Sequence, residues 1–395
     1  MLAVDINQVQ ATLQEWKLDG WLLYDFHKSN PIAYEILGFQ DGIITRRWFY
    51  WIPRDGTPIK LIHSIEAEYF DRIPGRNCVY TGWQEMNAHL EGILTKADTI
   101  AMEYSPKGAI PYISRVDTGT FELITSFGPD IVSSADLVQL FQARWDDEAY
   151  DLHMQTVPIM FDLKDRAFQI ISEKIRNGDT VTECQIQDWI MDGFAKNNME
   201  TEDPPIVAVN EHSGQPHYSP DHANDTEITE GDFVLIDMWA RLKQSKATYV
   251  DITWTGYVGE EVPERYTQIF NIVAEARDTG VQLIKDRWEA GKDIAGWEVD
   301  NATRAVIEDA GYGKFFTHRT GHSIDTSVHG NGVNIDNLET QDRRKIIPGM
   351  GFSIEPGIYL SEFGIRSEID VVMTENGPEI TTLPLQTHVL PLLGH

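Results

Sequence analysis

The segment that decides the fold is "DFVLIDMWARLKQSKATYVDITWTGYV", residues 232–258. It predicts two strands, because "DFVLIDMWA" and "ATYVDITWTGYV" are rich in branched and aromatic residues. Side chains alternate between the two faces of a strand, so Asp237 shares its face with the apolar Leu235 and Trp239. In the second strand, Asp251 stands between two branched residues. Each strand therefore places a carboxylate where an apolar side chain is expected.

Two further carboxylates occupy similar positions. Glu355 follows "GFSI", and Glu368 lies in "GIRSEIDVV", two positions from Arg366 and thus on the same face. A carboxylate inside an apolar strand is costly unless a cation, a metal ion or a proton offsets it. One such residue alone is commonly a solvated strand-end group. Four of them in one region favour a shared site.

Four carboxylates and a histidine would suit a divalent metal. Oxygen ligands favour manganese, iron, cobalt or zinc over copper, and four acidic ligands carry enough charge for two ions. The histidine has candidates in "FFTHRTGHSIDTSVHG", residues 315–330, which holds His318, His322 and His329. These ligands form no compact motif, so spacing alone leaves metal binding, catalysis and a structural role open.

The composition narrows the function classes. The chain has 395 residues, with 62 acidic against 32 basic, for a net charge of −30. Such an excess argues against nucleic acid or an anionic membrane surface as a partner. Two cysteines give no disulfide framework and fit a reducing compartment. Because neither a signal peptide nor a membrane-spanning run is recognisable, a cytoplasmic location is expected.

The pattern along the chain predicts two domains. Residues 1–143 alternate between helical and strand patterns, such as "GWLLYDF" and "WFYWI", and predict an α/β domain. Near Arg144 the pattern changes to a long helix over 146–175, followed by a capping-box pattern at Thr182. Helices and strands then mix to the end. We therefore predict an α+β chain with a second domain over residues 144–395.

Ordered blocks in the second domain resemble one known family. They are "SGQPHYSP", "VLIDMW", "YVDITWTG", "HRTGHSI", "PGMGFSIEPGIY" and "GIRSEID". In order and spacing they resemble the pita-bread metallohydrolases, which include aminopeptidase P, prolidase, methionine aminopeptidase and creatinase. The resemblance covers about residues 146–393. It implies a C-terminal pita-bread domain behind a smaller N-terminal α/β domain of the creatinase and prolidase type.

The resemblance also implies a set of metal ligands. By this correspondence Asp237 binds one ion, Asp251 and Glu368 bridge both ions, and His322 and Glu355 bind the other. Creatinase lacks this set, whereas all five ligand types are present here. That difference favours a metal-dependent member of the family.

Other residues take roles by the same resemblance. His217, His329 and Glu355 become catalytic residues, with Glu355 as a general acid and base. Arg366 is expected to pair with a ligand carboxylate. Apart from the resemblance, the neighbourhood of His318 fits the substrate pocket as well as it fits a polar residue at a strand end, and Asp325 is a possible pocket residue.

The function implied is a dinuclear metallopeptidase that hydrolyses Xaa-Pro bonds, as a prolidase or an aminopeptidase P. A water or hydroxide bridging the two ions would be the nucleophile. Manganese is the favoured metal, with cobalt, zinc or iron as alternatives. The partners expected are a peptide or small-molecule substrate and a second copy of the chain, because family members are commonly dimers.

Departures from the family pattern leave the substrate open. Ser323 and Asp325 replace glycines, Gly330 stands where prolidases carry an acid, and Trp254 stands for an arginine. The hairpin between the two aspartates is also a few residues longer than usual. A non-peptidase hydrolase or lyase acting on a small molecule is therefore the alternative, and a binding protein with a relic site is a third hypothesis.

Overall fold

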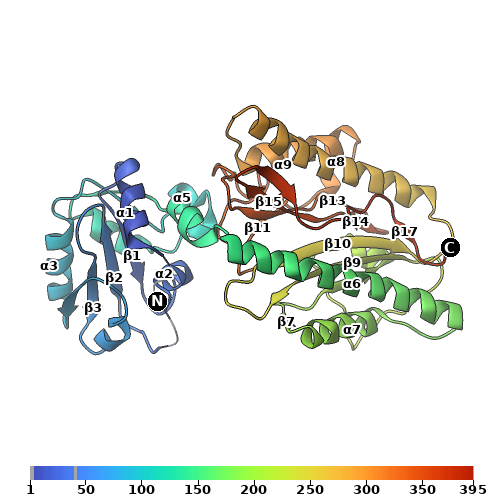
Figure 1. Cartoon of the computed structure of the whole chain (residues 1–395), viewed down its shortest axis with the longest axis horizontal. Helices are drawn as coiled ribbons and strands as arrows, with labels where there is room; N and C mark the ends of the chain where they lie inside the picture. Colours follow the sequence, from blue (N-terminus) through green and yellow to red (C-terminus); the bar gives the residue numbers. More distant parts are fainter. Residues whose placement is uncertain (1–3, 40–41, 395) are drawn as a thin grey trace. The chain divides into compact units, whose positions relative to one another are not determined.

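The computed structural model describes residues 4–39 and 42–394. The chain divides into two compact units, Met1–Gln142 and Ala143–His395. The division stands one residue from the boundary predicted between residues 143 and 144. Figure 1 shows the two units, which are described separately below.

The N-terminal unit is one mixed sheet with helices, ordered β4-β3-β2-β1-β5-β6. Its strands are β1 (Gly20–Asp25), β2 (Trp48–Pro53), β3 (Ile59–His63), β4 (Arg76–Tyr80), β5 (Thr99–Met102) and β6 (Asp130–Ser133). Its α-helices are α1 (Ile6–Glu15), α2 (Pro31–Leu37), α3 (Trp83–Leu94), α4 (Thr118–Thr125) and α5 (Ala135–Val138). The apolar runs that predicted strands form β1, β2, β3 and β5. Strands β4 and β6 lie at the sheet edges and are too polar to give that signal.

A buried carboxylate stands in the core of this unit. Glu103 has no exposed surface, and its oxygens accept hydrogen bonds from Trp21 Nε1 at 2.7 Å, Asn30 Nδ2 at 2.8 Å and Ser134 Oγ at 3.0 Å. Burial raises the pKa of Glu103 to about 7, although the three donors act in the opposite direction.

The raised pKa of Glu103 predicts how the stability of this unit depends on pH. Below pH 4.5, the ordinary pKa of glutamate, the carboxyl is protonated in both the folded and the unfolded protein. Its full contribution to the free energy of unfolding is present there. That contribution is lost as the pH rises towards 7, because the unfolded chain releases the proton first. The loss should reach about 3 kcal/mol at pH 8.

Amide hydrogen exchange in β1 and β5, corrected for intrinsic rates between pH 5 and 8, would measure this loss. The variant Glu103→Gln cannot titrate and should show a flatter profile. An equal pH slope in both proteins would contradict the assignment to Glu103.

The C-terminal unit carries four long helices and several small sheets. The helices are α6 (Asp147–Asn177), α7 (Glu183–Lys196), α8 (Glu264–Glu289) and α9 (Gly296–Asp309). The strands are β7 (Met199–Glu200), β8 (Ile206–Val209), β9 (Phe233–Leu242), β10 (Val250–Tyr257), β11 (Ser323–Ile324), β12 (Gly351–Ile354), β13 (Gly357–Tyr359), β14 (Gly364–Arg366), β15 (Ile369–Thr374), β16 (Gly377–Ile380) and β17 (Leu390–Pro391). The helix predicted over 146–175 is α6, and the capping-box pattern at Thr182 stands at the start of α7.

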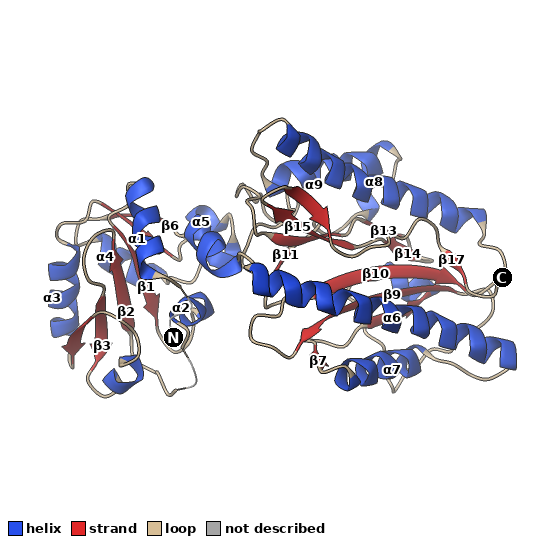
Figure 2. Cartoon of the chain, in the orientation of Figure 1, coloured by secondary structure: helices blue, strands red, loops and turns tan. Residues whose placement is uncertain are grey.

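The strands of this unit lie between two pairs of helices (Figure 2). One sheet has the order β17-β10-β9-β7, with β8 also paired to β9, and a second has the order β11-β12-β15-β16. Helix α6 packs on β9 and β10, whereas α8 packs on β12, β14 and β16. The predicted α+β class is therefore confirmed for this unit.

Local sequence signals fix the first helix and the hairpin. Helix α6 begins where the side chain of Asp146 accepts a hydrogen bond from Ala149 N, and it ends at Gly178, whose φ of 74° suits a glycine. Strands β9 and β10 form the predicted antiparallel hairpin, in which Asp237 is opposite Thr253 and Asp251 is opposite Trp239. This register brings both aspartates to one face of the sheet.

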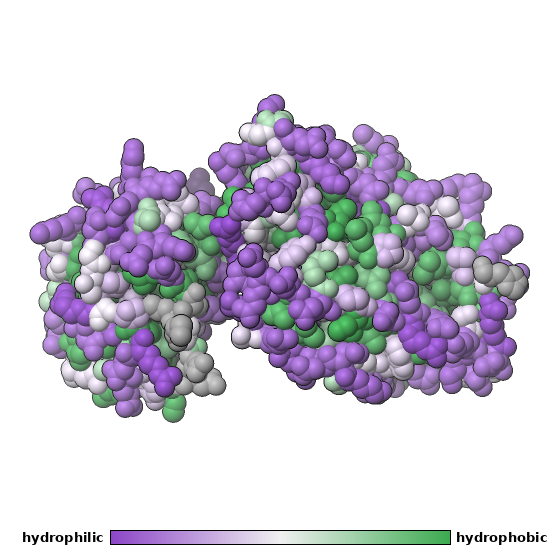
Figure 3. All heavy atoms as spheres, viewed as in Figure 1, coloured by the Kyte–Doolittle hydropathy of each residue, from purple (hydrophilic) through white to green (hydrophobic). Residues whose placement is uncertain are grey.

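The surface agrees with the acidic composition. Hydrophilic residues cover most of the face seen in Figure 3. Within residues 4–39 and 42–394, none of the helices combines the length and apolar character needed to cross a bilayer.

Candidate metal centre

Separate strands bring the predicted ligand residues to one region. Asp237 lies on β9 and Asp251 on β10, while His322 directly precedes β11. Glu355 follows β12, and Glu368 lies between β14 and β15. The structure therefore gathers residues that are up to 131 positions apart in sequence, counted from Asp237 to Glu368.

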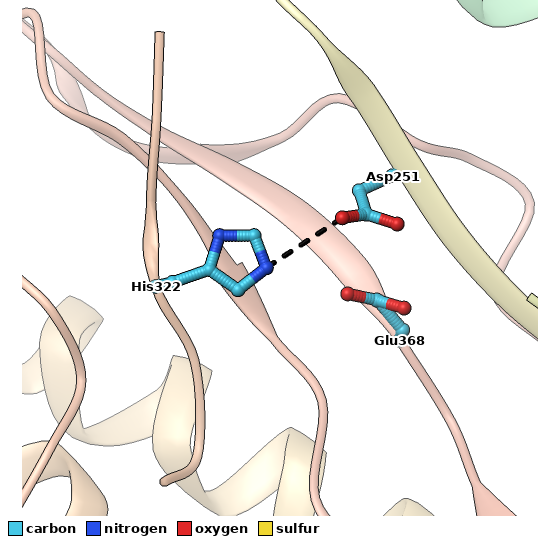
Figure 4. A group of neighbouring side chains, drawn as sticks. All are labelled: Asp251, His322 and Glu368. Atoms are coloured by element: carbon cyan, nitrogen blue, oxygen red, sulfur yellow. Dashed lines mark ion pairs between the residues drawn. The ribbon is translucent and has the colours of Figure 1, made fainter. Parts of the chain in front are cut away.

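Three of these side chains form a compact cluster. Asp251, His322 and Glu368 each offer a ligand atom, all three atoms lie within 4.8 Å of one another, and all three residues are buried. Figure 4 shows the His322 ring pointing at Asp251, with Glu368 beside them. His322 Nε2 is 3.5 Å from Asp251 Oδ2 and 3.4 Å from Glu355 Oε1. One ring nitrogen thus faces several carboxylate oxygens.

Hydrogen bonds fix which nitrogen of His322 faces the cluster. His322 Nδ1 lies 3.2 Å from the carbonyl oxygen of Ser323, to which it can only donate. Nε2 is then the nitrogen with a free lone pair. The backbone N–H of His322 donates to Ser353 Oγ at 3.0 Å, which holds the residue in place. The ring is therefore oriented as a metal-binding imidazole requires.

The cluster carries more negative charge than the protein offsets. Burial raises the pKa of Asp251 well above its ordinary value, and the charges of Asp237, Asp370 and Glu355 add to this effect. Burial and Asp251 likewise raise the pKa of Glu368. Asp237 Oδ1 and Asp251 Oδ1 are buried and accept no hydrogen bond from any described residue. Unpaired carboxylate oxygens around a neutral imidazole fit divalent cations.

Arg366 is the main cation of this site. It is 4% exposed, and its guanidinium is paired with Asp237 through Nη2. Its Nε donates to Thr253 Oγ1 at 3.0 Å, and Thr253 Oγ1 donates to Glu368 Oε2 at 2.6 Å. Burial alone would lower the pKa of Arg366, but Asp237 and the other acids nearby raise it. Arg366 thus contacts the carboxylate of Asp237 directly and that of Glu368 through one hydroxyl.

The same guanidinium reaches His318. Arg366 Nη1 donates to the hydroxyl of Tyr359 at 3.0 Å, and that hydroxyl lies 2.6 Å from His318 Nε2. His318 Nδ1 donates to the carbonyl of Arg319 at 2.6 Å, so Nε2 accepts from Tyr359. Burial and the Arg366 charge lower the pKa of His318 to about 3. His318 is therefore a neutral member of the network beside the cluster.

Glu355 stands where a proton-transfer group would be useful. Its Oε1 accepts from Ser353 Oγ at 3.3 Å, and its Oε2 is 3.9 Å from Arg366 Nε. Burial raises the pKa of Glu355 to about 7, with Arg366 acting in the opposite direction. A carboxyl that can both hold and release a proton near neutral pH suits general acid–base chemistry.

The two remaining histidines stand at the more open side. The rings of His329 and His322 are perpendicular, with centroids 4.4 Å apart. Although the side chain of His329 is exposed, desolvation by the surrounding protein lowers its pKa to about 4, and the charge of Arg319 lowers it further. His217 is exposed and close enough for its charge to lower the pKa of His329.

Sequence reasoning missed a layer of buried polar residues behind the cluster. Asp370 has no exposed surface, and its Oδ2 accepts from the backbone N–H of Asp251 at 2.9 Å. His153 is fully buried between the Tyr249 carbonyl at 2.9 Å and Thr381 Oγ1 at 2.7 Å. Asp370 had a signal in "GIRSEIDVV", as an acid within an apolar strand.

A second missed residue holds the segment that carries His217. Glu183 is fully buried and accepts hydrogen bonds from Val209 N at 2.7 Å, His212 Nδ1 at 2.9 Å and Tyr218 OH at 2.6 Å. The rings of His212 and Tyr218 stack at 4.3 Å. Glu183 therefore anchors residues on both sides of His217. In sequence it resembled an ordinary acid of a first helical turn.

The chain was compared with protein families and with known relatives. A model of metallopeptidase family M24 matches residues 161–375. The chain belongs to metallopeptidase family M24. An uncharacterized peptidase of Staphylococcus aureus strain USA300 is 27% identical over 267 residues, which are 66% of this chain and 69% of the relative. The M24 chain is therefore a metallopeptidase, as predicted.

Solved structures confirm the predicted pita-bread fold behind an N-terminal α/β domain. The dipeptidase PepE of Mycobacterium ulcerans has a TM-score of 0.72 at 20% identity, covering 98% of this chain and 96% of that one. An X-Pro aminopeptidase of Thermotoga maritima has a TM-score of 0.60 at 26% identity, and the match covers 95% of this chain and 98% of that one. An X-prolyl aminopeptidase of Caenorhabditis elegans is described as a cytosolic enzyme with a di-nuclear active site. Its structure has a TM-score of 0.66 at 16% identity, and the match covers 97% of this chain and 62% of that one.

Proposed function

We propose that this M24 metallopeptidase binds two divalent ions and hydrolyses Xaa-Pro peptide bonds. The observation that carries the proposal is the buried cluster itself. Asp251, His322 and Glu368 form it, Glu355 Oε1 lies 3.4 Å from His322 Nε2, and Arg366 pairs with Asp237 and Glu355. Burying such a set is costly unless cations compensate it.

The residues divide into ligands and groups that act on the substrate. Asp237, Asp251, His322, Glu355 and Glu368 would hold the ions, with manganese favoured among the divalent metals that oxygen ligands suit. Ions bound there would polarise the scissile carbonyl and lower the pKa of the attacking water. Arg366 pairs with the Asp237 carboxylate and holds it in place.

Three groups of the chain would act on the substrate. Glu355 takes a proton from the attacking water and returns it to the leaving nitrogen, as a general base and then a general acid. His217 and His329, at the open side, donate hydrogen bonds to the oxygen that becomes negative when the carbonyl is attacked. His318 presents its ring beside the same network and is proposed to contact the substrate.

The proposed preference for Xaa-Pro bonds is supported by one similar solved structure and by two sequence blocks. The T. maritima structure at 26% identity is an X-Pro aminopeptidase, and the blocks "HRTGHSI" and "SGQPHYSP" resemble those of proline-specific members. A homodimer is proposed on the same resemblance, and a cytoplasmic location on the sparse use of cysteine.

A panel of peptides tests this proposal. Metal-free protein is reconstituted with manganese, cobalt, zinc or iron and given Xaa-Pro dipeptides, Xaa-Pro-Yaa tripeptides and matched Xaa-Ala controls. Release of proline or of the first residue from the proline peptides, at least about tenfold faster than from the alanine controls, is expected, a ratio equivalent to about 1.4 kcal/mol. Fully metal-loaded protein that cleaves no proline peptide would exclude this specificity.

The small-molecule alternative loses its structural motivation. Trp254 lies on the opposite face of β10 from Asp251 and packs against α6, with Lys164 Nζ 3.6 Å from its ring centroid. The carboxylate of Asp325 binds the backbone of its own loop. Neither residue gives an observation that favours a different reaction class.

A further inference from the structure

The loop that carries His329 is held by one buried carboxylate. Asp325 is 4% exposed. Its Oδ1 accepts from the backbone N–H of Ser327 at 2.8 Å, and its Oδ2 accepts from that of Asn331 at 3.3 Å. These two donors stand on either side of His329. The carboxylate of Asp325 therefore fastens the loop before and after this histidine.

Gly330 leaves the space that this carboxylate fills. A Cβ atom at Gly330 would lie 2.5 Å from Asp325 Oδ2 and 2.7 Å from its Cγ. The backbone of Gly330 is not in the left-handed region, so room rather than conformation requires glycine here. A carboxylate at position 330 would compete for the volume that Asp325 occupies.

Ser323 belongs to the same arrangement. Its hydroxyl accepts from the backbone N–H of Gly332 at 3.0 Å and would lie 2.5 Å from a Cβ at that position. A Cβ at Gly330 would also lie 3.0 Å from Ser323 Oγ, so Gly330 packs against both Ser323 and Asp325, the two other departures noted in this stretch of sequence. Packing within the loop accounts for these three residue types, so a different substrate is not needed to explain them.

The loop is tied to the segments that carry the proposed ligands. The Ser323 carbonyl accepts both from Gly330 N at 2.7 Å and from His322 Nδ1 at 3.2 Å. The Asp325 carbonyl accepts from Tyr249 N at 3.1 Å, two residues before Asp251. A change in the conformation of this loop should therefore change how the His329 ring is oriented against His322.

We propose that Asp325 is a positioning residue for His329. Its carboxylate sets the loop so that the His329 ring stands edge-on to His322, and Gly330 is the residue that makes room for it. The functional part of this inference rests on the proposed peptidase activity. The orientation of the ring does not, so the two can be tested apart.

A double-mutant cycle tests the functional part. Asp325→Ala is expected to lower kcat by about 10–100-fold with little change in KM, the scale of a misplaced catalytic group. Asp325→Asn keeps one acceptor oxygen and should lose less. In a His329→Ala background, Asp325→Ala should cause no further loss, because its effect acts through that ring. A full loss in that background would overturn the proposal.

Histidine side-chain NMR tests the positioning itself, with or without turnover. The ring signals of His329, assigned from their absence in His329→Ala, should shift in Asp325→Asn. Asp336→Asn is the matched control, because Asp336 is also fully buried and fastens its own loop through the N–H groups of Leu338, Glu339 and Thr340. Unchanged His329 signals in Asp325→Asn, or an equal shift in the control, would overturn the proposal. If the wild type cleaves no peptide but the signals shift, only the proposed function fails.

Moving the carboxylate between the two positions is a further test. Gly330→Asp should lower kcat at least as much as Asp325→Ala, because two like charges would meet at overlapping positions. The double variant, Asp325→Gly with Gly330→Asp, is expected to recover most of that loss. A folded double variant that recovers nothing would contradict the shared-space argument.

Discussion

Replacing Asp251 with asparagine is expected to abolish stoichiometric metal binding and to lower kcat/KM by at least about 100-fold. Changes in residues that only support metal ligands cost about 10–100-fold, so the loss of a proposed ligand itself should exceed that range. Asp251 is central to the cluster, since its carboxylate faces His322 and shares the site with Asp237 and Glu368. Asparagine keeps the shape but offers a neutral amide.

The same substitution should stabilise the metal-free protein. Asp251 is 3% exposed, and its charge is opposed by burial and by the charges of Asp237, Asp370 and Glu355. Removing one of several like charges from a buried site removes repulsion without leaving a partner unpaired. The melting temperature in the presence of a chelator should therefore rise while activity disappears. Elemental analysis, kinetics and thermal melts measure the three effects.

Asp370→Asn is the matched control. Asp370 is equally buried and lies directly behind Asp251, whose N–H it binds at 2.9 Å. The asparagine can still accept that hydrogen bond, so this variant removes a charge but no ligand. It should keep the wild-type metal stoichiometry, with affinity reduced by at most about 100-fold. Equal metal loss in both variants would show that charge alone, rather than ligand geometry, determines binding.

Strand periodicity was sufficient to predict the hairpin face of the site. Asp237 and Asp251 interrupt apolar runs, and the antiparallel register places them on one face, as alternation requires. The buried residues behind them were not predictable in this way. His153 and Glu183 lie in amphipathic helices, where a polar residue commonly faces solvent. Only the packing of distant segments shows that both are buried.

The departures near His329 show a second limit of sequence reasoning. Asp325 in place of a glycine suggested an added charge beside the substrate. Whether a carboxylate faces a pocket or binds its own loop depends on where the chain returns, which is set by Asn331, six residues later. A pattern of residue types cannot distinguish these outcomes, because both leave the same acid at the same position.

Removing the guanidinium of Arg366 is expected to cause the largest loss of stability of any single substitution in the metal-free site. Arg366 is 4% exposed and paired with Asp237, so Arg366→Ala leaves a buried carboxylate without its cation. Breaking a buried pair from one side costs about 3–5 kcal/mol. Arg366→Lys keeps the charge but loses the forked guanidinium that reaches Thr253 and Tyr359. Its stability should therefore lie between those of the wild type and Arg366→Ala. Urea unfolding in a chelator measures these differences.

The dependence of this loss on metal separates an electrostatic role from simple packing. With cations bound, the carboxylates are neutralised by another partner, so Arg366→Ala should destabilise the loaded protein less than the metal-free one. Metal should therefore raise the melting temperature of this variant by more than that of the wild type. Arg344→Ala is the control, because Arg344 forms an equally buried pair with Asp342, which is not a proposed metal ligand, and its loss should cost the same in either state. If metal restores no more stability to Arg366→Ala than to Arg344→Ala, Arg366 does not offset the charge of the cluster.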